Sequence, residues 1–140
     1  MAGYSKTNPA SVKQNARFSD ISIGFGFNPF SKDVTRITDV DAVKRSIKSL
    51  VMTNKYERLL DPDIGGNVTG MLFEPMTALS ESILQNYITE VIENYEPRAR
   101  LEYVQVQANP DNYSLNVTIR FKVDTSETSQ SLEFLLDRVR

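Results

Sequence analysis

The sequence contains no cysteine, no histidine and no tryptophan. Without cysteine the chain has no disulfide framework, thiol nucleophile or cysteine-based zinc site. Without histidine it lacks the commonest general base and a common metal ligand. These absences exclude most familiar enzyme sites, and we expect no cofactor and no bound metal.

The chain also lacks an excess of positive charge and any long apolar run. Sixteen Lys and Arg against eighteen Asp and Glu give a net charge of −2, which argues against a nucleic-acid partner. The local basic group of Lys44, Arg45 and Lys48 fits a solvated helix face. No apolar stretch is long enough to span a bilayer, and the first residues lead into no signal-peptide core. We therefore expect a soluble protein that does not interact with membranes and is not exported by the general secretory route.

A length of 140 residues, 40% of them hydrophobic, is typical of one globular domain with a real core. Residues 1–17 differ from the rest, because they are mostly polar and show no periodicity. So few apolar side chains cannot offset the entropy of fixing the backbone. The composition predicts an extended N-terminal arm over residues 1–17 and a single domain over residues 18–140.

The clearest periodic signal lies near the C-terminus. Apolar residues occupy every second position from Tyr113 to Val123, which is the pattern of a strand with one buried face. Val104 and Val106 form a weaker strand upstream, and the turn-forming residues 109–112 separate the two. The pattern predicts an antiparallel hairpin. A last strand is expected around Leu132, Phe134 and Leu136, after a polar link over Ser126–Ser131.

A similar alternation occurs near the N-terminus. Ile21, Ile23, Phe25 and Phe27 alternate with small or polar residues, which predicts a first strand whose aromatic side chains are buried. Residues 34–37 fit a short returning strand.

Two helices are expected between these strands. The first is predicted from Thr38, as the N-cap, to about Thr53, and the second from Pro75, at the first helical position, to a stop before Pro97. Together the elements predict an α+β fold, in which a small mixed or antiparallel sheet packs against two main helices. The apolar stripe of the first helix contains Val43, Ile47, Leu50 and Val51, and the wider stripe of the second contains Met76, Leu79, Ile83, Leu84, Tyr87, Ile88, Val91, Ile92 and Tyr95.

The connection between the helices contains an incomplete match to a calcium-binding loop. Asp61, Asp63 and Gly66 fit the template, but Gly65 and Leu72 stand where two further ligands are needed. A structural turn explains this segment better.

Several short motifs occur in an order that resembles the gene-25-like baseplate wedge family of contractile phage tails, which also occurs in type VI secretion baseplates. The resemblance spans about Asp20 to Arg140. Tyr56 is one departure, because the family usually has glycine at this position before Glu-Arg. The motifs are Val43–Leu50, Glu57-Arg58, Asp61-Pro62-Asp63-Ile64-Gly65-Gly66, Leu72-Phe73-Glu74-Pro75 and Glu96-Pro97-Arg98.

This resemblance implies a structural subunit of the virion tail baseplate that is assembled in the host cytoplasm. Such a subunit would hold the wedge core together and nucleate the sheath by accepting sheath strands at its sheet edge. Its expected partners are the tail sheath protein and other wedge subunits, with no small-molecule substrate. The candidate partner-binding residues are Glu96, Pro97, Arg98, Glu57 and Arg58, and the alternative is that Glu96 and Arg98 only tie the helix end to the hairpin.

Two other functions compete with this one. A lysozyme-like tail enzyme that degrades peptidoglycan would need two carboxyl groups, one of them with a raised pKa, and Glu74, Glu81, Glu90 and Glu96 are the candidates. Nothing in the sequence marks an apolar pocket around one of them, so we assign no catalytic residue. A small adaptor that binds one soluble partner through the same sheet edge is the third hypothesis.

Overall fold

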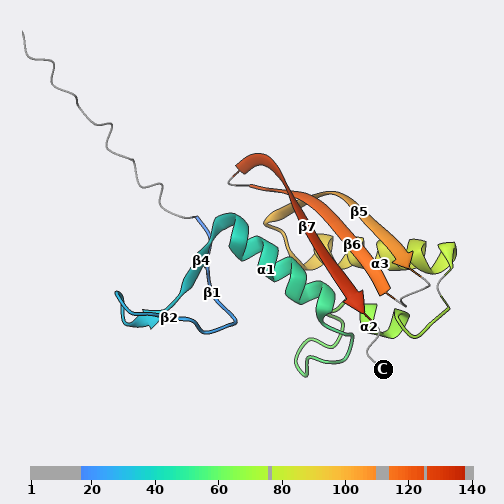
Figure 1. Cartoon of the computed structure of the whole chain (residues 1–140), viewed down its shortest axis with the longest axis horizontal. Coiled ribbons are helices and arrows are strands. Elements are labelled where there is room, and N and C mark those ends of the chain that lie inside the picture. The colour runs from blue at the N-terminus through green and yellow to red at the C-terminus, as the bar shows by residue number, and fades with distance from the viewer. Residues whose placement is uncertain (1–16, 76, 110–113, 125, 138–140) are drawn as a thin grey trace, which may run out of the picture.

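The computed structural model describes residues 17–75, 77–109, 114–124 and 126–137. The fold is α+β, as the sequence predicts. A three-stranded sheet packs on two helices, and a narrow N-terminal ribbon projects from the body (Figure 1). Residues 1–16 of the expected arm lie outside the described residues, as does most of the turn expected at residues 109–112.

The sheet has the order β5-β6-β7 and is antiparallel throughout. Strand β5 (Ala99–Asn109) pairs with β6 (Ser114–Val123), which confirms the predicted hairpin, and β6 pairs with β7 (Ser126–Asp137). The expected polar link over Ser126–Ser131 is wrong, because these residues belong to β7. An edge strand with one wet face can be polar, and pairing with β6 decides its extent.

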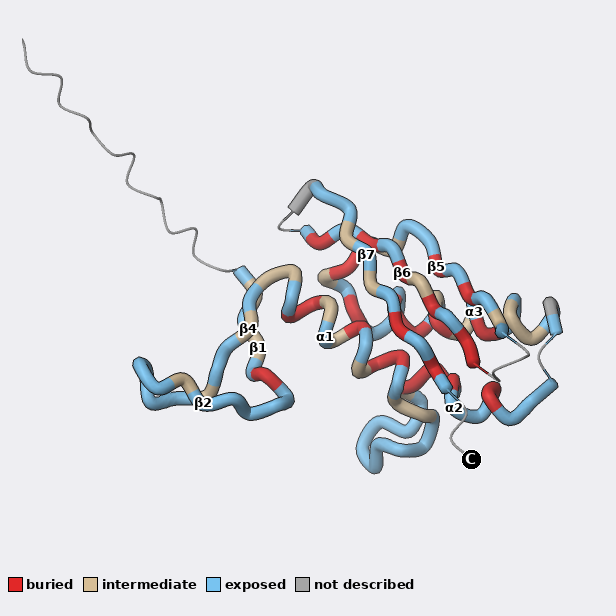
Figure 2. Tube along the Cα trace, in the orientation of Figure 1, coloured by how far each residue is buried: buried red, intermediate tan, exposed pale blue. Residues whose placement is uncertain are grey.

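Helices α1 (Asp39–Met52) and α3 (Ala78–Tyr95) cover the apolar face of the sheet. Buried residues gather between the helices and the sheet (Figure 2). The alternation predicted for β6 is confirmed, because its inward side chains are all buried. The core includes Val43, Ile47 and Val51 of α1, Leu84, Ile88 and Ile92 of α3, and Val117, Ile119 and Phe121 of β6.

Helix α3 begins three residues later than the sequence predicts. Thr77 is the N-cap, and the hydroxyls of Thr77 and Ser80 satisfy each other's backbone N–H groups in a capping box. This cap outweighs the preference of Pro75 for the first helical position. The predicted stripe is also too wide, because Leu79 is 69% exposed and Ile83 lies at the surface.

The N-terminal segment forms two short ribbons rather than one buried strand. Strand β1 (Ser19–Ile21) pairs with β4 (Arg36–Thr38), and β2 (Phe27–Asn28) pairs with β3 (Asp33–Val34). The expected burial of Phe25 and Phe27 is wrong. The ribbons extend away from the core (Figure 2), and both side chains are exposed to solvent.

The connection between α1 and α3 contains one helical turn, α2 (Val68–Met71), which the sequence analysis missed. Gly65 has φ +143°, and a Cβ at this position would meet backbone atoms of Thr53 and Asn54. Among the described residues, no three potential metal-ligating side chains come together, and no helix is both long and apolar enough to cross a membrane.

Candidate partner-binding site

The junction between α3 and β5 places Glu96, Pro97 and Arg98 at one end of the sheet. Glu96 is the C-cap of α3, and its N–H donates to the carbonyl of Ile92 at 2.9 Å. The N–H of Ala99 in turn donates to the carbonyl of Glu96 at 3.1 Å, which closes a tight turn around Pro97. Proline favours this turn because it cannot continue the helix. The chain therefore leaves α3 and enters β5 within a few residues.

Within this turn, Glu96 and Arg98 form a two-pronged ion pair. The Nε–H of Arg98 donates to Oε1 of Glu96 at 2.6 Å, and Nη2–H donates to Oε2 at 2.9 Å. The Glu96 carboxylate is only 2% exposed, whereas the Arg98 side chain is 25% exposed. A planar guanidinium can bind both oxygens of a carboxylate at once, which fixes its orientation as well as its distance.

Arg98 also connects the body of the protein to the N-terminal ribbon. Its Nη1–H donates to Oδ2 of Asp20 in β1 at 3.1 Å, and its guanidinium lies 5.6 Å from the ring centre of Phe18. Asp20 and Phe18 were not predicted as members of this site. No local pattern could have identified them, because they are far from Arg98 in the sequence. Arg98 thus joins three segments: the end of α3, the start of β5 and β1.

The ion pair shifts the pKa of both Glu96 and Arg98. Burial alone would raise the pKa of Glu96, but hydrogen bonds from Arg98 and Ser46 and the charge of Arg98 outweigh burial, so the pKa is lowered. The hydrogen bond to Glu96 raises the pKa of Arg98 despite its partial burial. Glu96 is therefore a carboxylate at neutral pH. A general acid for glycoside hydrolysis needs the opposite shift, a raised pKa.

Glu57 and Arg58 lie on the loop after α1, and among the described residues the ion pair of Glu96 is with Arg98 and not with Arg58. Oε2 of Glu57 accepts a hydrogen bond from the N–H of Asn54 at 2.8 Å, so Glu57 holds its own loop. Tyr56, which precedes it, has φ +67°, a left-handed conformation that favours glycine.

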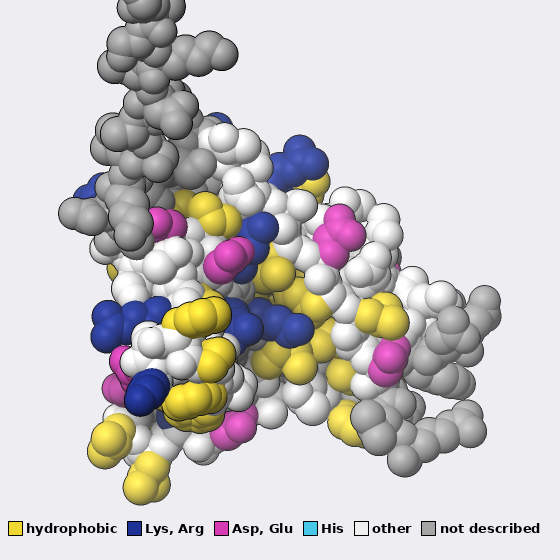
Figure 3. All heavy atoms as spheres, turned by 60° about the vertical axis from the view of Figure 1, so that its left-hand side comes forward, with side chains coloured by type: hydrophobic (Ala, Val, Ile, Leu, Met, Phe, Trp, Pro, Cys, Tyr) yellow, Lys and Arg dark blue, Asp and Glu magenta, His cyan; other side chains and the backbone are white. Residues whose placement is uncertain are grey.

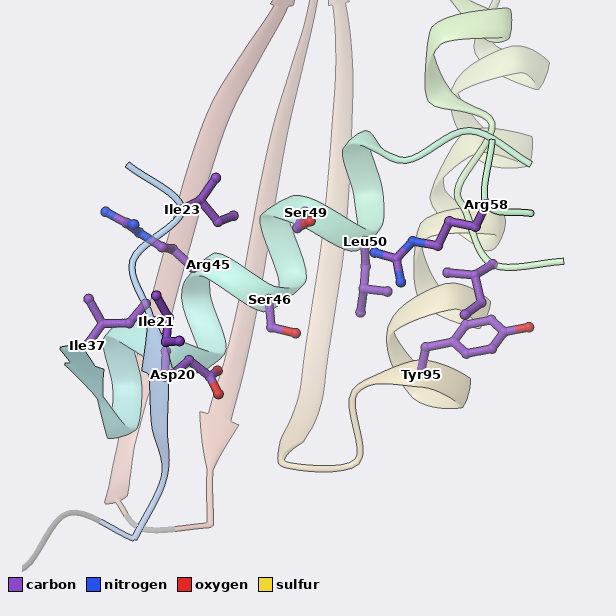
Figure 4. Close-up of a pocket in the computed structure, with 12 residues that line it drawn as sticks. Asp20, Ile21, Ile23, Ile37, Arg45, Ser46, Ser49, Leu50, Arg58 and Tyr95 are labelled. Carbon is purple, nitrogen blue, oxygen red and sulfur yellow. The ribbon is translucent and has the colours of Figure 1, made fainter. Parts of the chain in front are cut away.

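A groove lies between the two groups of candidate residues. Asp20, Tyr95 and Arg58 all line it, and Arg58 extends from the loop towards the α1 side of the groove (Figure 4). Asp20 binds Arg98, so the ion-pair site forms one end of the groove, and Arg58 lies at the other.

The two outer edges of the sheet differ. On β5, the N–H of Ala108 donates to Oε1 of Glu81 from α3 at 2.8 Å, so the protein's own side chain occupies this position. Glu81, one of the four candidate acids, is thereby assigned a structural contact. On β7, no strand of the described residues pairs with the outer edge.

Comparison with known proteins gives consistent matches. A family model described as baseplate wedge protein gp25 matches residues 38–128. The baseplate wedge protein gp25 of enterobacteria phage T4 is 35% identical over 109 residues, which are 78% of this chain and 82% of the phage protein.

Solved structures share the fold at lower identity. A candidate tail lysozyme from Geobacter sulfurreducens superposes with a TM-score of 0.63 at 21% identity, over 71% of this chain and 91% of that one. A chain of the anti-feeding prophage baseplate gives 0.60 at 24% identity, over 84% and 83%. A chain of a type VI secretion baseplate complex gives 0.61 at 15% identity, over 72% and 94%.

Proposed function

The chain belongs to the family of baseplate wedge protein gp25, and from this premise we propose that it is a structural wedge subunit of a contractile tail baseplate. In this role it is located in the tail baseplate and contacts other baseplate subunits. The finer part of the proposal is that the subunit nucleates the tail sheath. Sheath strands are added to the outer edge of β7, which acts as a template.

The open edge of β7 is the observation that carries the proposal. This strand spans Ser126–Asp137, and its sequence contains neither proline nor lysine, the residues with which natural proteins often protect an edge. The opposite edge, on β5, is occupied at Ala108 by Glu81. An incoming extended segment can therefore form main-chain hydrogen bonds with β7 more readily than with β5.

The length of β7 is sufficient to give such an addition useful affinity. Each intramolecular hydrogen bond contributes roughly 0.5–1.5 kcal/mol net, and an edge strand directs both the N–H and the C=O group of every second residue outward. Several bonds together fix the direction and register of the added strand.

The candidate residues take different roles in this proposal. Pro97, the exposed part of Arg98, Glu57 and Arg58 contact neighbouring subunits at the two opposite ends of the groove. Glu96 is too deeply buried to present a surface, and it positions Arg98 instead.

We do not propose catalysis. The family relative is named a baseplate wedge protein, and the likeness to a candidate tail lysozyme is at an identity that supports the shared fold alone.

Proline substitution in β7 tests the template. Neighbouring residues of a strand point their N–H groups to opposite sides of the strand. Two variants, Gln130→Pro and Ser131→Pro, therefore have different effects. One of them removes a hydrogen bond to β6 and lowers the melting temperature. The other removes an outward donor and leaves the melting temperature nearly unchanged. We expect baseplates with this second variant to form, but the fraction that carries sheath in electron micrographs to fall several-fold.

The corresponding alanine variant keeps the N–H and is the matched control, for which we expect normal sheath. Sheath of normal frequency on the thermally stable proline variant would rule out the β7 edge as the template.

A further inference from the structure

The N-terminal ribbon exposes an unusual amount of apolar surface. Ile21, Ile23, Phe25, Phe27 and Phe30 are each between 63% and 97% exposed. Hydrophobic side chains gather on the projecting ribbon and in the hollow between the ribbon and the body (Figure 3). Contiguous exposed apolar surface of this kind marks an interaction site. Residues 17–37 lie outside the segment that the family model matches, residues 38–128.

The ribbon and α1 enclose a groove of about 330 Å³. Ile21, Ile23 and Ile37 form one wall (Figure 4). The other wall is one face of α1 over two turns, and Ile64 and Tyr95 lie at its far end. The α1 wall consists of Ala42, Arg45, Ser46, Ser49 and Leu50, which recur at helical spacing.

Two arginines bring positive charge to this groove. Arg45 donates to the hydroxyl of Ser22 at 2.5 Å, and within the described parts of the chain neither Arg45 nor Arg58 forms an ion pair with a carboxylate. The groove also contains the carboxylate of Asp20, but Arg98 binds that group. The groove therefore presents two guanidinium groups to an incoming chain.

The chain's own N-terminal arm does not have a complementary composition. Residues 1–16 contain Lys6 and Lys13, no Asp or Glu, and few large apolar side chains. A basic segment gains nothing from two arginines, because like charges side by side are unfavourable. The occupant should instead be apolar on one side and acidic at its margins.

We propose that this groove binds an acidic amphipathic α-helix of a neighbouring baseplate subunit. A helix fits because one wall is itself a helix face, and two helices pack by fitting the side-chain rows of one between those of the other. The apolar side chains of the partner helix fill the space between Leu50 and the isoleucines, and its carboxylates pair with Arg45 and Arg58. The identity of the partner as a baseplate subunit rests on the proposed function.

Binding to a wedge subcomplex assembled without this subunit tests the proposal. Arg58→Glu reverses a charge at the groove, and Ile23→Asp places a charge on its apolar wall. Both residues are exposed, so the melting temperature should stay within a few degrees of the wild type. We expect each variant to raise the dissociation constant for the subcomplex at least tenfold. For Arg58→Glu this increase should be larger at low salt than at high salt.

Lys48→Glu is the matched control, because Lys48 is exposed on α1 but does not line the groove. It should change the dissociation constant less than twofold. Equal affinity of both groove variants and the wild type would overturn the proposal.

A photo-crosslinking amino acid at position 23 identifies the occupant. The proposal requires crosslinks to a helical segment rich in Asp and Glu within another wedge subunit. Crosslinks to a second copy of this chain, to sheath or to a non-helical segment would contradict it. The test is separable from the one on β7: the groove variants fail at wedge binding, whereas the edge variant enters the wedge and fails at sheath growth.

Discussion

At the scale of single residues, Arg98 is the most informative side chain. Its guanidinium binds Glu96 through two hydrogen bonds and Asp20 through a third. The sequence alone left open whether Arg98 meets a partner or ties the helix end to the hairpin. The geometry shows that it ties these elements together and also holds β1. In the partner contact that we propose for Arg98, the protein itself has already fixed the position of the guanidinium.

The ion pair leads to a prediction about stability and pH. In Arg98→Gln, the buried carboxylate of Glu96 loses its cation, and the free energy of unfolding at pH 7 should fall by about 3 kcal/mol. In the wild type the pKa of Glu96 is lowered by folding, so ionised Glu96 contributes to the free energy of unfolding above the unfolded-state pKa of about 4.3. This contribution decreases as the pH falls below that value. In the variant, burial raises the pKa of Glu96, so protonation stabilises the fold.

The difference in the free energy of unfolding between the wild type and Arg98→Gln should therefore become smaller from pH 7 to pH 4, as measured by urea unfolding. Arg100→Gln is the control, because Arg100 pairs with Asp124 but its side chain is 80% exposed. That variant should lose less than about 1 kcal/mol. A constant difference between Arg98→Gln and the wild type across this pH range would show that Glu96 is not the group involved.

At the scale of elements, the loop between α1 and α2 is fixed by backbone geometry. Asp61 and Asp63 suggested calcium, but the decisive residues are Gly65 and Gly66. The N–H of Gly66 donates to the carbonyl of Thr53 at 3.1 Å, which brings the loop back to the end of α1. A Cβ on Gly65 would lie 2.5 Å from that same carbonyl oxygen. The loop thereby holds Arg58 and Ile64 at the groove.

Gly65→Ala should destabilise the protein strongly. The substitution places a side chain at φ +143° and against backbone atoms that cannot move independently. A left-handed conformation alone costs roughly 1–2 kcal/mol for a residue with a Cβ, so we expect a total loss of at least about 2 kcal/mol in denaturant unfolding.

Gly24→Ala provides the comparison, since its Cβ would meet only the Ser22 hydroxyl at 3.9 Å. It should be close to neutral. Similar losses for the two variants would show that the effect comes from alanine in general and not from the close approach at Gly65.

At the scale of the whole molecule, the body and the ribbon have different surfaces. The body buries its apolar residues between the sheet and the helices, whereas the ribbon exposes them (Figure 2). We propose that assembly uses both regions: the ribbon and groove attach the subunit to the wedge, and β7 receives the sheath. We further propose that residues 1–17 act as an arm separate from the domain over residues 18–140.

Removal of residues 1–15 tests this division. Arg17 and Phe18 remain, and their N–H groups both donate to Oδ1 of Asp39 at the start of α1. We expect the melting temperature to change by less than 2 °C or so, because less than about 0.5 kcal/mol is lost, while wedge attachment in a pull-down weakens. Removal of residues 1–18 is the contrasting variant, since it deletes both donors to Asp39 and should lower the melting temperature. A large thermal loss on removal of residues 1–15 would show that the arm is part of the core.

The sequence by itself determined the elements whose signal is local. The alternation from Leu115 to Val123, the apolar stripe of α1 and the stop at Pro97 each depend on neighbouring residues, and each is found in the structure. The ordered motifs also identified the family. Local patterns sufficed because burial of one face imposes the period of the element on the sequence.

Only the tertiary structure decided which surfaces are paired and which are left open. Ile21 to Phe27 have the alternation of a buried strand, yet the ribbon extends beyond the core and leaves its apolar side chains exposed. Arg98 meets Asp20 across 78 residues of sequence, and within the part of the chain that the structure describes β7 pairs with a strand on one side only. The periodicity of apolar residues indicates which residues share one side of a helix or strand. What lies on that side depends on the path of the whole chain, which no local pattern contains.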